Sequence, residues 1–255
     1  MKKLLLPFLL IAVSLSAQPD IEWQKSLGGS EFEDAFSIQQ TSEGGYIVAG
    51  YTYSQDGLVA ENHGASDFWI VKLNGIGVIE WQKSLGGSNN EWSNAIRQTN
   101  DGGYIVAGFT ESNDGDVLGY HGGKDAWVVK LSNIGTIIWQ KALGGSGWDE
   151  VLSVKVTSDG GYILSGRTNS NNGDVSGNHS GSLDCWVLKL NDSGEIQWQK
   201  SLGGSDSETA HSIMETSEGG FILAGETKSN DGDVSGNHGD IDFWIVKLSN
   251  SGSIE

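Results

Sequence analysis

The sequence predicts an all-β protein, a β-propeller built from four-stranded antiparallel blades. One unit of about 58 residues is written four times along the chain. Each unit holds short segments of alternating or continuous apolar residues, separated by Gly-rich turns, and none has the sustained 3.6-residue period of a helix. Short strands with apolar residues on both faces are typical of propeller blades, because neighbouring blades cover both faces.

The first 17 residues predict a signal peptide. Lys2 and Lys3 give a positively charged start, and residues 4–15 are mostly apolar. Small residues at Ser14-Leu-Ser-Ala17 then suit cleavage before Gln18. The apolar run is too short to span a bilayer comfortably. We therefore expect an exported chain, secreted or at the cell surface, with no membrane insertion after cleavage.

Three sequence blocks mark every unit. Trp-Gln-Lys-(Ser/Ala)-Leu-Gly-Gly-Ser recurs with spacings of 58, 58 and 59 residues, beginning at Trp23, Trp81, Trp139 and Trp198. Gly-Gly-(Tyr/Phe)-Ile-(Val/Leu)-(Ala/Ser)-Gly begins at Gly44, Gly102, Gly160 and Gly219. Asp-X-Trp-(Ile/Val)-(Val/Leu)-Lys-Leu begins at Asp67, Asp125, Asp184 and Asp242. The blocks define a repeat domain over residues 18–255, with units at 23–80, 81–138, 139–197 and 198–255.

Each unit predicts four strands, which in the first unit are expected at residues 35–41, 46–53, 67–73 and 78–85. Glycines at Gly44 and Gly45 suit a tight turn between the first two strands, since glycine adopts positive φ without steric cost. A long polar loop separates the second strand from the third. Tryptophans recur in the third and fourth strands, so we expect all eight to pack between blades.

The second unit carries the clearest family likeness. Its segments Asp101–Ser112, Lys124–Leu131 and Trp139–Gly145, with Gly135 between them, resemble the SBBP-type β-propeller repeats of large secreted bacterial proteins. The resemblance covers essentially all of the chain after the signal peptide. It implies a propeller fold but no common reaction, cofactor or ligand.

The repeat begins and ends in the same phase, with Ile21-Glu22-Trp23 at the start and Ile254-Glu255 at the end. Two arrangements fit this phase. Residues 21–27 complete the last blade and give a closed four-bladed ring, or the chain is a fragment of a longer array. An unclosed array leaves strand edges exposed, which finished proteins normally cover.

The net charge limits the kinds of partner that the chain is expected to bind. The chain carries a net charge of −18 and a single cysteine, Cys185, so it has no internal disulfide. Nucleic acid is excluded as a partner, because binding to phosphates needs a basic surface. An acidic exported surface instead suits an extracellular protein or a polysaccharide, and divalent cations.

The long loop between the second and third strands gathers acidic turn residues. Asp114-Gly115-Asp116 and Asp231-Gly232-Asp233 place carboxylates on either side of a glycine. This pattern suits Ca²⁺, with Asp114, Asp116, Asp231 and Asp233 as ligands. It equally suits structural turns, because Asp and Asn bond their own backbone. No cofactor is required, and Ca²⁺ is the one that the sequence suggests.

Histidines and two unmatched tryptophans complete the candidate ligand face. One slot of the long loop holds His63, His121, His179 and His238. Each unit offers one such histidine, so a hydrogen bond to the next Asp is a commoner role than binding Zn²⁺. Trp92 and Trp148 follow the fourth strands and lack counterparts in the first and last units. Strand parity places them at the same end as the long loops, where aromatic rings can stack on sugars.

No catalytic motif is found. The chain lacks a Gly-X-Ser-X-Gly elbow, His-Glu-X-X-His and a phosphate loop, and its acids recur equally in every unit. We therefore expect a secreted or cell-surface binding or scaffold module without catalytic activity. The alternative is a carbohydrate-active enzyme or glycan-binding propeller that uses acidic and Trp residues on the long-loop face. The short hairpins of the opposite face are expected to be too small for a pocket.

Overall fold

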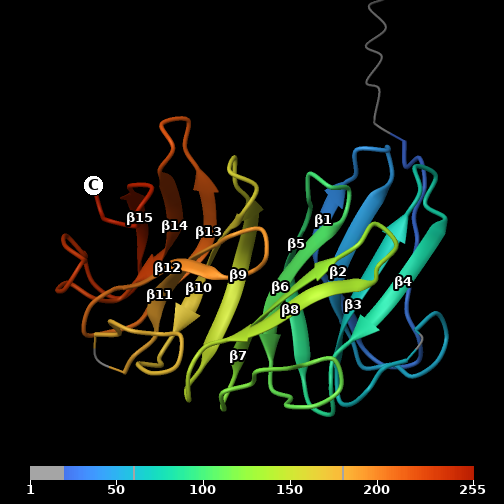
Figure 1. The fold of residues 1–255 in the computed structure, drawn as a ribbon, viewed down its shortest axis with the longest axis horizontal. Coiled ribbons are helices and arrows are strands. Elements are labelled where there is room, and N and C mark those ends of the chain that lie inside the picture. The colour runs from blue at the N-terminus through green and yellow to red at the C-terminus, as the bar shows by residue number, and fades with distance from the viewer. Residues whose placement is uncertain (1–19, 60, 180) are drawn as a thin grey trace, which may run out of the picture.

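A computed structural model describes residues 20–59, 61–179 and 181–255, so the predicted signal peptide lies outside the described residues. The described chain folds into fifteen strands and no helix (Figure 1). Accordingly, these residues include no helix long and apolar enough to cross a membrane. The all-β prediction is confirmed.

The strands form four antiparallel sheets, which we call blades, each with its strands paired in chain order. The first blade contains β1 (Glu33–Gln40), β2 (Tyr46–Thr52), β3 (Asp67–Leu73) and β4 (Ile79–Leu85). The second contains β5 (Glu91–Gln98), β6 (Tyr104–Thr110), β7 (Asp125–Leu131) and β8 (Ile137–Leu143). The third contains β9 (Asp149–Val156), β10 (Tyr162–Thr168), β11 (Asp184–Leu190) and β12 (Ile196–Leu202). The fourth contains β13 (Glu208–Glu215), β14 (Phe221–Thr227) and β15 (Asp242–Leu248).

The fourth blade differs from the prediction of four strands in every unit. It has three paired strands, and only an isolated bridge from Ile254 to Leu248 begins a fourth. The segment Ile21–Leu27, which repeats the sequence of β4, β8 and β12, does not pair with β15 among the described residues. The edge of β15 is therefore open except at Lys247 and Leu248, where Glu255 and Ile254 bond to it.

The blades stand side by side in chain order, with the first and the fourth at opposite ends of the molecule (Figure 1). The opening strands β1, β5, β9 and β13 pack against one another in series. Within the described part of the chain, no strand of the first blade pairs with a strand of the fourth. The structure thus shows the repeated propeller-like blades, while closure of a four-bladed ring is not shown.

The hydrophobic core lies in the seams, our term for the interfaces between consecutive blades. In the first seam, Phe68 and Ile70 of β3 are fully buried against the second blade. The rings of Phe68 and Trp127 approach to 4.7 Å between centroids. Gly108 pairs with Trp127, and a Cβ at this glycine would collide with the Trp92 carbonyl at the bulge of β5. The glycine is therefore required for the first two strands of the blade to approach.

The tryptophans of the fourth strands pack against the seams as predicted, but Trp139, which was expected to be buried, is only half-buried. Trp127 and Trp186, in the third strands, are fully buried. Trp81, Trp139 and Trp198, in the fourth strands, are only half-buried. Each of these leans on the turn of the next blade, where its indole N–H donates to a carbonyl oxygen at 3.1–3.2 Å. A neighbouring turn is too short to cover the whole indole.

The tryptophans of the third and the fourth strands predict different costs of truncation. We expect Trp127→Ala to lower the free energy of unfolding by about 3–5 kcal/mol, because it empties a fully enclosed site. Trp139→Ala keeps a solvent-accessible side and should cost about 1–2 kcal/mol. Denaturant unfolding followed by circular dichroism measures both, and equal losses would contradict this division.

Candidate functional site

The long loops and the connections between blades meet at one end of the molecule, which we call the long-loop end. The long loops are residues 53–66, 111–124, 169–183 and 228–241, and the connections are residues 86–90, 144–148 and 203–207. Each connection lies against the long loop of the blade that follows it, as when Asp116 N–H donates to the Gly86 carbonyl at 2.9 Å. The long loops of the first three blades lie along the lower edge of the view in Figure 1.

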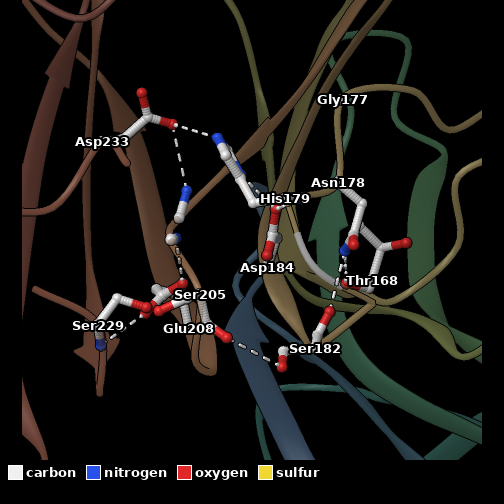
Figure 2. Close-up of polar contacts among 12 residues, drawn as sticks. Thr168, Gly177, Asn178, His179, Ser182, Asp184, Ser205, Glu208, Ser229 and Asp233 are labelled. Atoms are coloured by element: carbon white, nitrogen blue, oxygen red, sulfur yellow. Dashed lines mark hydrogen bonds and ion pairs between the residues drawn. The ribbon is translucent and has the colours of Figure 1, made fainter. Parts of the chain in front are cut away.

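A polar cluster joins the third and fourth blades at this end (Figure 2). His179 Nδ1 lies 2.7 Å from Asp184 Oδ2 of its own blade, and its Nε2 lies 3.6 Å from Asp233 Oδ2 of the next. The hydrogen bond to Asp184 raises the pKa of His179. His179 therefore connects the two blades, through Asp184 of its own blade and Asp233 of the next. The contact with Asp233 is an ion pair when the ring is protonated.

The bond from the histidine to the Asp of its own blade recurs in the other two seams, and the contact to the next blade recurs at His121. His63 lies 2.6 Å from Asp67, and His121 lies 2.9 Å from Asp125 and 3.9 Å from Asp174 of the next blade. The predicted ligand-face histidines are thus placed one in each seam, with His238 on the last loop. The His238 side chain is 89 % exposed, against 31–36 % for the other three, because no further blade covers it.

Beneath each of the three seam histidines, two acidic residues from neighbouring blades are buried together. Asp67 and Glu91 are both fully buried, and a Cβ on Gly86 would collide with carboxylate oxygens of both. Glu91 accepts hydrogen bonds from Gly87 N–H and Thr110 Oγ1, whereas Asp67 Oδ1 has no partner among the described residues. Burial raises the pKa of both carboxyl groups. Sequence analysis did not find this pairing, because the two residues come from different units.

The acids predicted as Ca²⁺ ligands accept backbone hydrogen bonds. Asp114 Oδ1 lies 2.8 Å from Ser88 N, and Asp231 Oδ1 lies 2.7 Å from Ser205 N. Asp116 and Asp233 accept from glycine N–H groups at 3.3 and 3.2 Å. The bond from Ser205 lowers the pKa of Asp231. No group of three or more His, Cys, Asp or Glu side chains suited to a metal occurs in the described part of the chain. Calcium binding stays a prediction.

A row of aromatic rings runs across the first seam at the long-loop end. Trp92 stacks on Tyr51, with 4.6 Å between centroids and 18° between planes. Tyr53 contacts Tyr51 edge-on at 5.6 Å, and Phe109 lies 5.4 Å from Trp92. Trp92 Nε1 also donates to Ser66 Oγ at 2.9 Å, which fixes the ring. Except for the buried Phe109, these rings are partly open to solvent.

The row continues to Trp148 at the second seam. Lys124 Nζ lies 3.6 Å from the Phe109 centroid and 4.4 Å from the Trp148 centroid, so one cation joins the two rings. Arg167 lies 5.0 Å from the Trp148 centroid and bonds the buried Glu150 at 2.8 Å. Trp148 is 38 % exposed. We call the whole set the aromatic strip: Tyr51, Tyr53, Trp92, Phe109, Lys124, Trp148, Arg167 and Glu150.

Only Trp92 and Trp148 of the strip were predicted from the sequence. A signal for a further member was present, because Tyr51, Phe109, Arg167 and Glu226 occupy one slot of the repeat. Most slots keep their residue type in all four units, whereas this one holds two aromatic residues, a cation and an acid. Divergence within a repeat marks positions that packing does not fix.

A hollow of about 380 Å³ at the opposite, hairpin end corrects another expectation. Its lining includes Trp139, Tyr162 and the ion pair of Lys130 with Asp101 at 2.9 Å. The hairpins themselves are short, as predicted. The hollow lies between hairpins of the second and third blades, because both Asp101 and Asp192 line it.

Comparisons with known proteins give likenesses of fold only. No known family matches the sequence, and no curated protein matches it. Among solved structures, a xylan β-1,4-xylosidase from Bacillus halodurans has 15 % identity and a TM-score of 0.46, over 89 % of this chain and 44 % of the enzyme. A levansucrase variant from B. megaterium has 12 % identity and a TM-score of 0.41, over 88 % of this chain and 67 % of the enzyme. The chain thus spans less than half of the xylosidase.

These comparisons correct the prediction of a protein without catalytic activity. The two solved structures are both enzymes by name, a xylosidase and a levansucrase. The prediction of a protein without catalytic activity is withdrawn. At this level of identity, neither enzyme assigns an activity or a substrate to this chain.

The buried acids predict a dependence of stability on pH. Burial raises the pKa of Asp125 from 3.8 to about 6, so the folded state keeps this proton to higher pH than the unfolded chain. The resulting stabilisation is present below about pH 4 and is lost as the pH rises through about 6. Between these values, the native chain should lose on the order of 2 kcal/mol more than Asp125→Asn. Asp192→Asn, on an exposed turn, is the control. Parallel pH profiles for the native chain and Asp125→Asn would refute the assignment.

The Asp turns allow a second test. We expect Asp114→Ala to lower the free energy of unfolding by about 1–2 kcal/mol, because the Ser88 N–H loses its acceptor. If the turn is structural, the loss is the same in a chelator and in millimolar calcium. A melting temperature that rises with calcium in the native chain but not in the variant would instead establish the predicted metal site.

Proposed function

We propose that this chain recognises a neutral polysaccharide along the aromatic strip. The single observation that carries the proposal is the continuous run of contacts from Tyr53 through Trp92 to Trp148, across two seams of the molecule. Partly exposed rings held in a fixed geometry can contact the apolar faces of sugars at little entropic cost. A strip that crosses blades suits an extended polymer better than a compact ligand.

The charges of the strip support a neutral partner. Arg167 is neutralised by Glu150 at 2.8 Å, and Lys124 lies 3.7 Å from Glu111. The strip therefore offers no free cation for a sulfate or a uronic acid. The chain as a whole, at −18, repels anionic polymers.

The proposal extends to the type of propeller and to the export of the chain. We infer that the blades belong to a β-propeller of the SBBP-like type and that residues 1–17 direct export, so that the strip meets its ligand outside the cell. The apolar seams between successive blades support the propeller. The positive start and apolar run of the leader support export.

A binding screen tests the recognition. The purified chain is applied to neutral polymers (cellulose, mannan, β-glucan) and to anionic ones (pectate, heparin), and captured ligands are titrated by calorimetry. We expect retention on a neutral polymer and a loss of affinity of about tenfold in Trp148→Ala, as for one aromatic stacking contact. Leu118→Ala, 70 % exposed on a long loop, is the matched control. Binding that survives Trp148→Ala and Trp92→Ala together would show that the strip is not the site.

The same polymers test for turnover, by release of reducing sugar. Glu150 is the buried acid bonded to the arginine that lies on Trp148, so Glu150→Gln is the variant to compare. Release that is lost in this variant while binding persists would make the strip an active site rather than a binding surface alone.

A further inference from the structure

The fourth blade exposes a face that is buried in every other blade. Phe243 is 97 % exposed and Ile245 is 67 % exposed. Their counterparts in the first blade, Phe68 and Ile70, carry the same side chains and are fully buried under the second blade. The counterparts in the second and third blades are also fully buried: Ala126, Val128, Cys185 and Val187. A Phe and an Ile at such exposure mark an interaction surface.

The first blade has the matching face, which no preceding blade covers among the described residues. In the first seam, Trp127 and Val129 pack against Phe68 and Ile70 of the preceding blade. On the first blade, the matching pair Trp69 and Val71 packs only with its own blade and with residues 20–29. A hollow of about 380 Å³ remains there, between Trp23, Leu27 and the strands. Ile38, at its border, is 62 % exposed.

The open edge of β15 lacks a specific partner as well. The indole N–H groups of Trp69, Trp127 and Trp186 donate to a glutamine of the fourth strand, at 2.7–3.0 Å. Trp244 makes no such bond among the described residues. The glutamine that repeats this position is Gln24, in the segment that lies on the first blade rather than beside β15.

We propose that the fourth blade of one chain packs on the first blade of a second copy and forms one more seam. Phe243 and Ile245 fill the hollow beside Trp69, and Trp23–Leu27 of the second copy pairs with β15, beyond the bridge that Ile254 already makes to Leu248. The register of β11 with β12 transfers directly, because Val187 pairs with Lys200, so Ile245 faces Lys25 of the second copy. Trp244 then donates to Gln24.

A second copy is the occupant because the two faces belong to one repeating interface, already formed three times in the chain. The blades that carry them lie at opposite ends of the molecule (Figure 1), so one chain in this form does not satisfy both. The contact is head-to-tail. Successive copies form a closed ring if the rotation between them closes, and an open filament if it does not. The contact between histidine and Asp is not repeated in the new seam, because Leu58 stands where Asp174 and Asp233 face a histidine in other seams. The new seam therefore rests on apolar packing and strand pairing.

Solution mass gives the first test. Light scattering of the purified chain over a range of concentrations should show two or more copies per particle. Phe243→Asp should shift the particle to a single chain, and folding is not at issue because this side chain is 97 % exposed. Ile134→Asp, 66 % exposed on a turn outside the interface, should leave the mass unchanged. A single-chain mass for the native protein at every concentration would overturn the proposal.

Cross-linking gives the second test and separates two copies from one. Lys25→Cys and Ile245→Cys are made as separate variants and mixed, so any disulfide between them joins two chains. Cys185 does not interfere, because it is buried and burial raises its pKa. We expect a mixed dimer on a non-reducing gel. A disulfide that forms only within the double variant, which then runs as a single chain, would show closure within one chain and refute the second copy.

Discussion

Every blade of this molecule depends on the seam beside it. The third strand of a blade is apolar on both faces, so an isolated blade would expose either Phe68 and Ile70 or Trp69 and Val71 to water. Burial of a large apolar side chain contributes about 1.5–3 kcal/mol, and each seam collects several of them. Stability therefore accumulates by stacking, as in other repeat architectures. The exposed Phe243 shows what a blade lacks when no neighbour follows.

The polar cluster at the long-loop end gives each seam its geometry. Burying Asp67 and Glu91 together is costly, and the protein offsets the cost with bonds from Gly87 N–H, Thr110 and the histidine. Each of these bonds lies within one blade, and a further bond crosses the seam beside them, from Glu91 N–H to the Ser66 carbonyl at 2.7 Å. That bond helps to fix how far one blade turns relative to the next. Apolar packing alone tolerates small rotations, whereas a buried carboxylate does not tolerate the loss of its donors. The raised pKa of both acids is the consequence of this design.

The strands within one unit could be predicted from the sequence. The contacts between units could not. The alternation within one unit located β2 and β3 to within a residue or two, because strand periodicity and Gly turns are local properties. β1 begins two residues earlier than expected, with a bulge between Ala35 and Ser37. The half-burial of Trp139 could not be predicted, since it depends on how far the next blade reaches. The same holds for the pair of Asp67 with Glu91, and for Tyr51 stacked on Trp92, whose partners are separated by 24 and 41 positions and meet only when blades stack.

Where the four units differ is therefore as informative as where they agree. Residues that repeat in every unit, such as the Gly beside each bulge and the Asp that begins each third strand, are explained by the seam alone. The slot of Tyr51, Phe109, Arg167 and Glu226 follows the bulge glycine at the long-loop end, where a strand leaves the blade. Three of these four side chains are partly exposed and Phe109 alone is buried, so the repeat does not impose one residue type on the slot. In this chain, Tyr51 and Phe109 lie beside Trp92, and Arg167 lies beside Trp148. Neither tryptophan has a counterpart in the first or the last unit. This surface is ordered by contacts across two seams, yet the repeat itself does not need it, and for that reason the proposed recognition of a ligand is assigned to it.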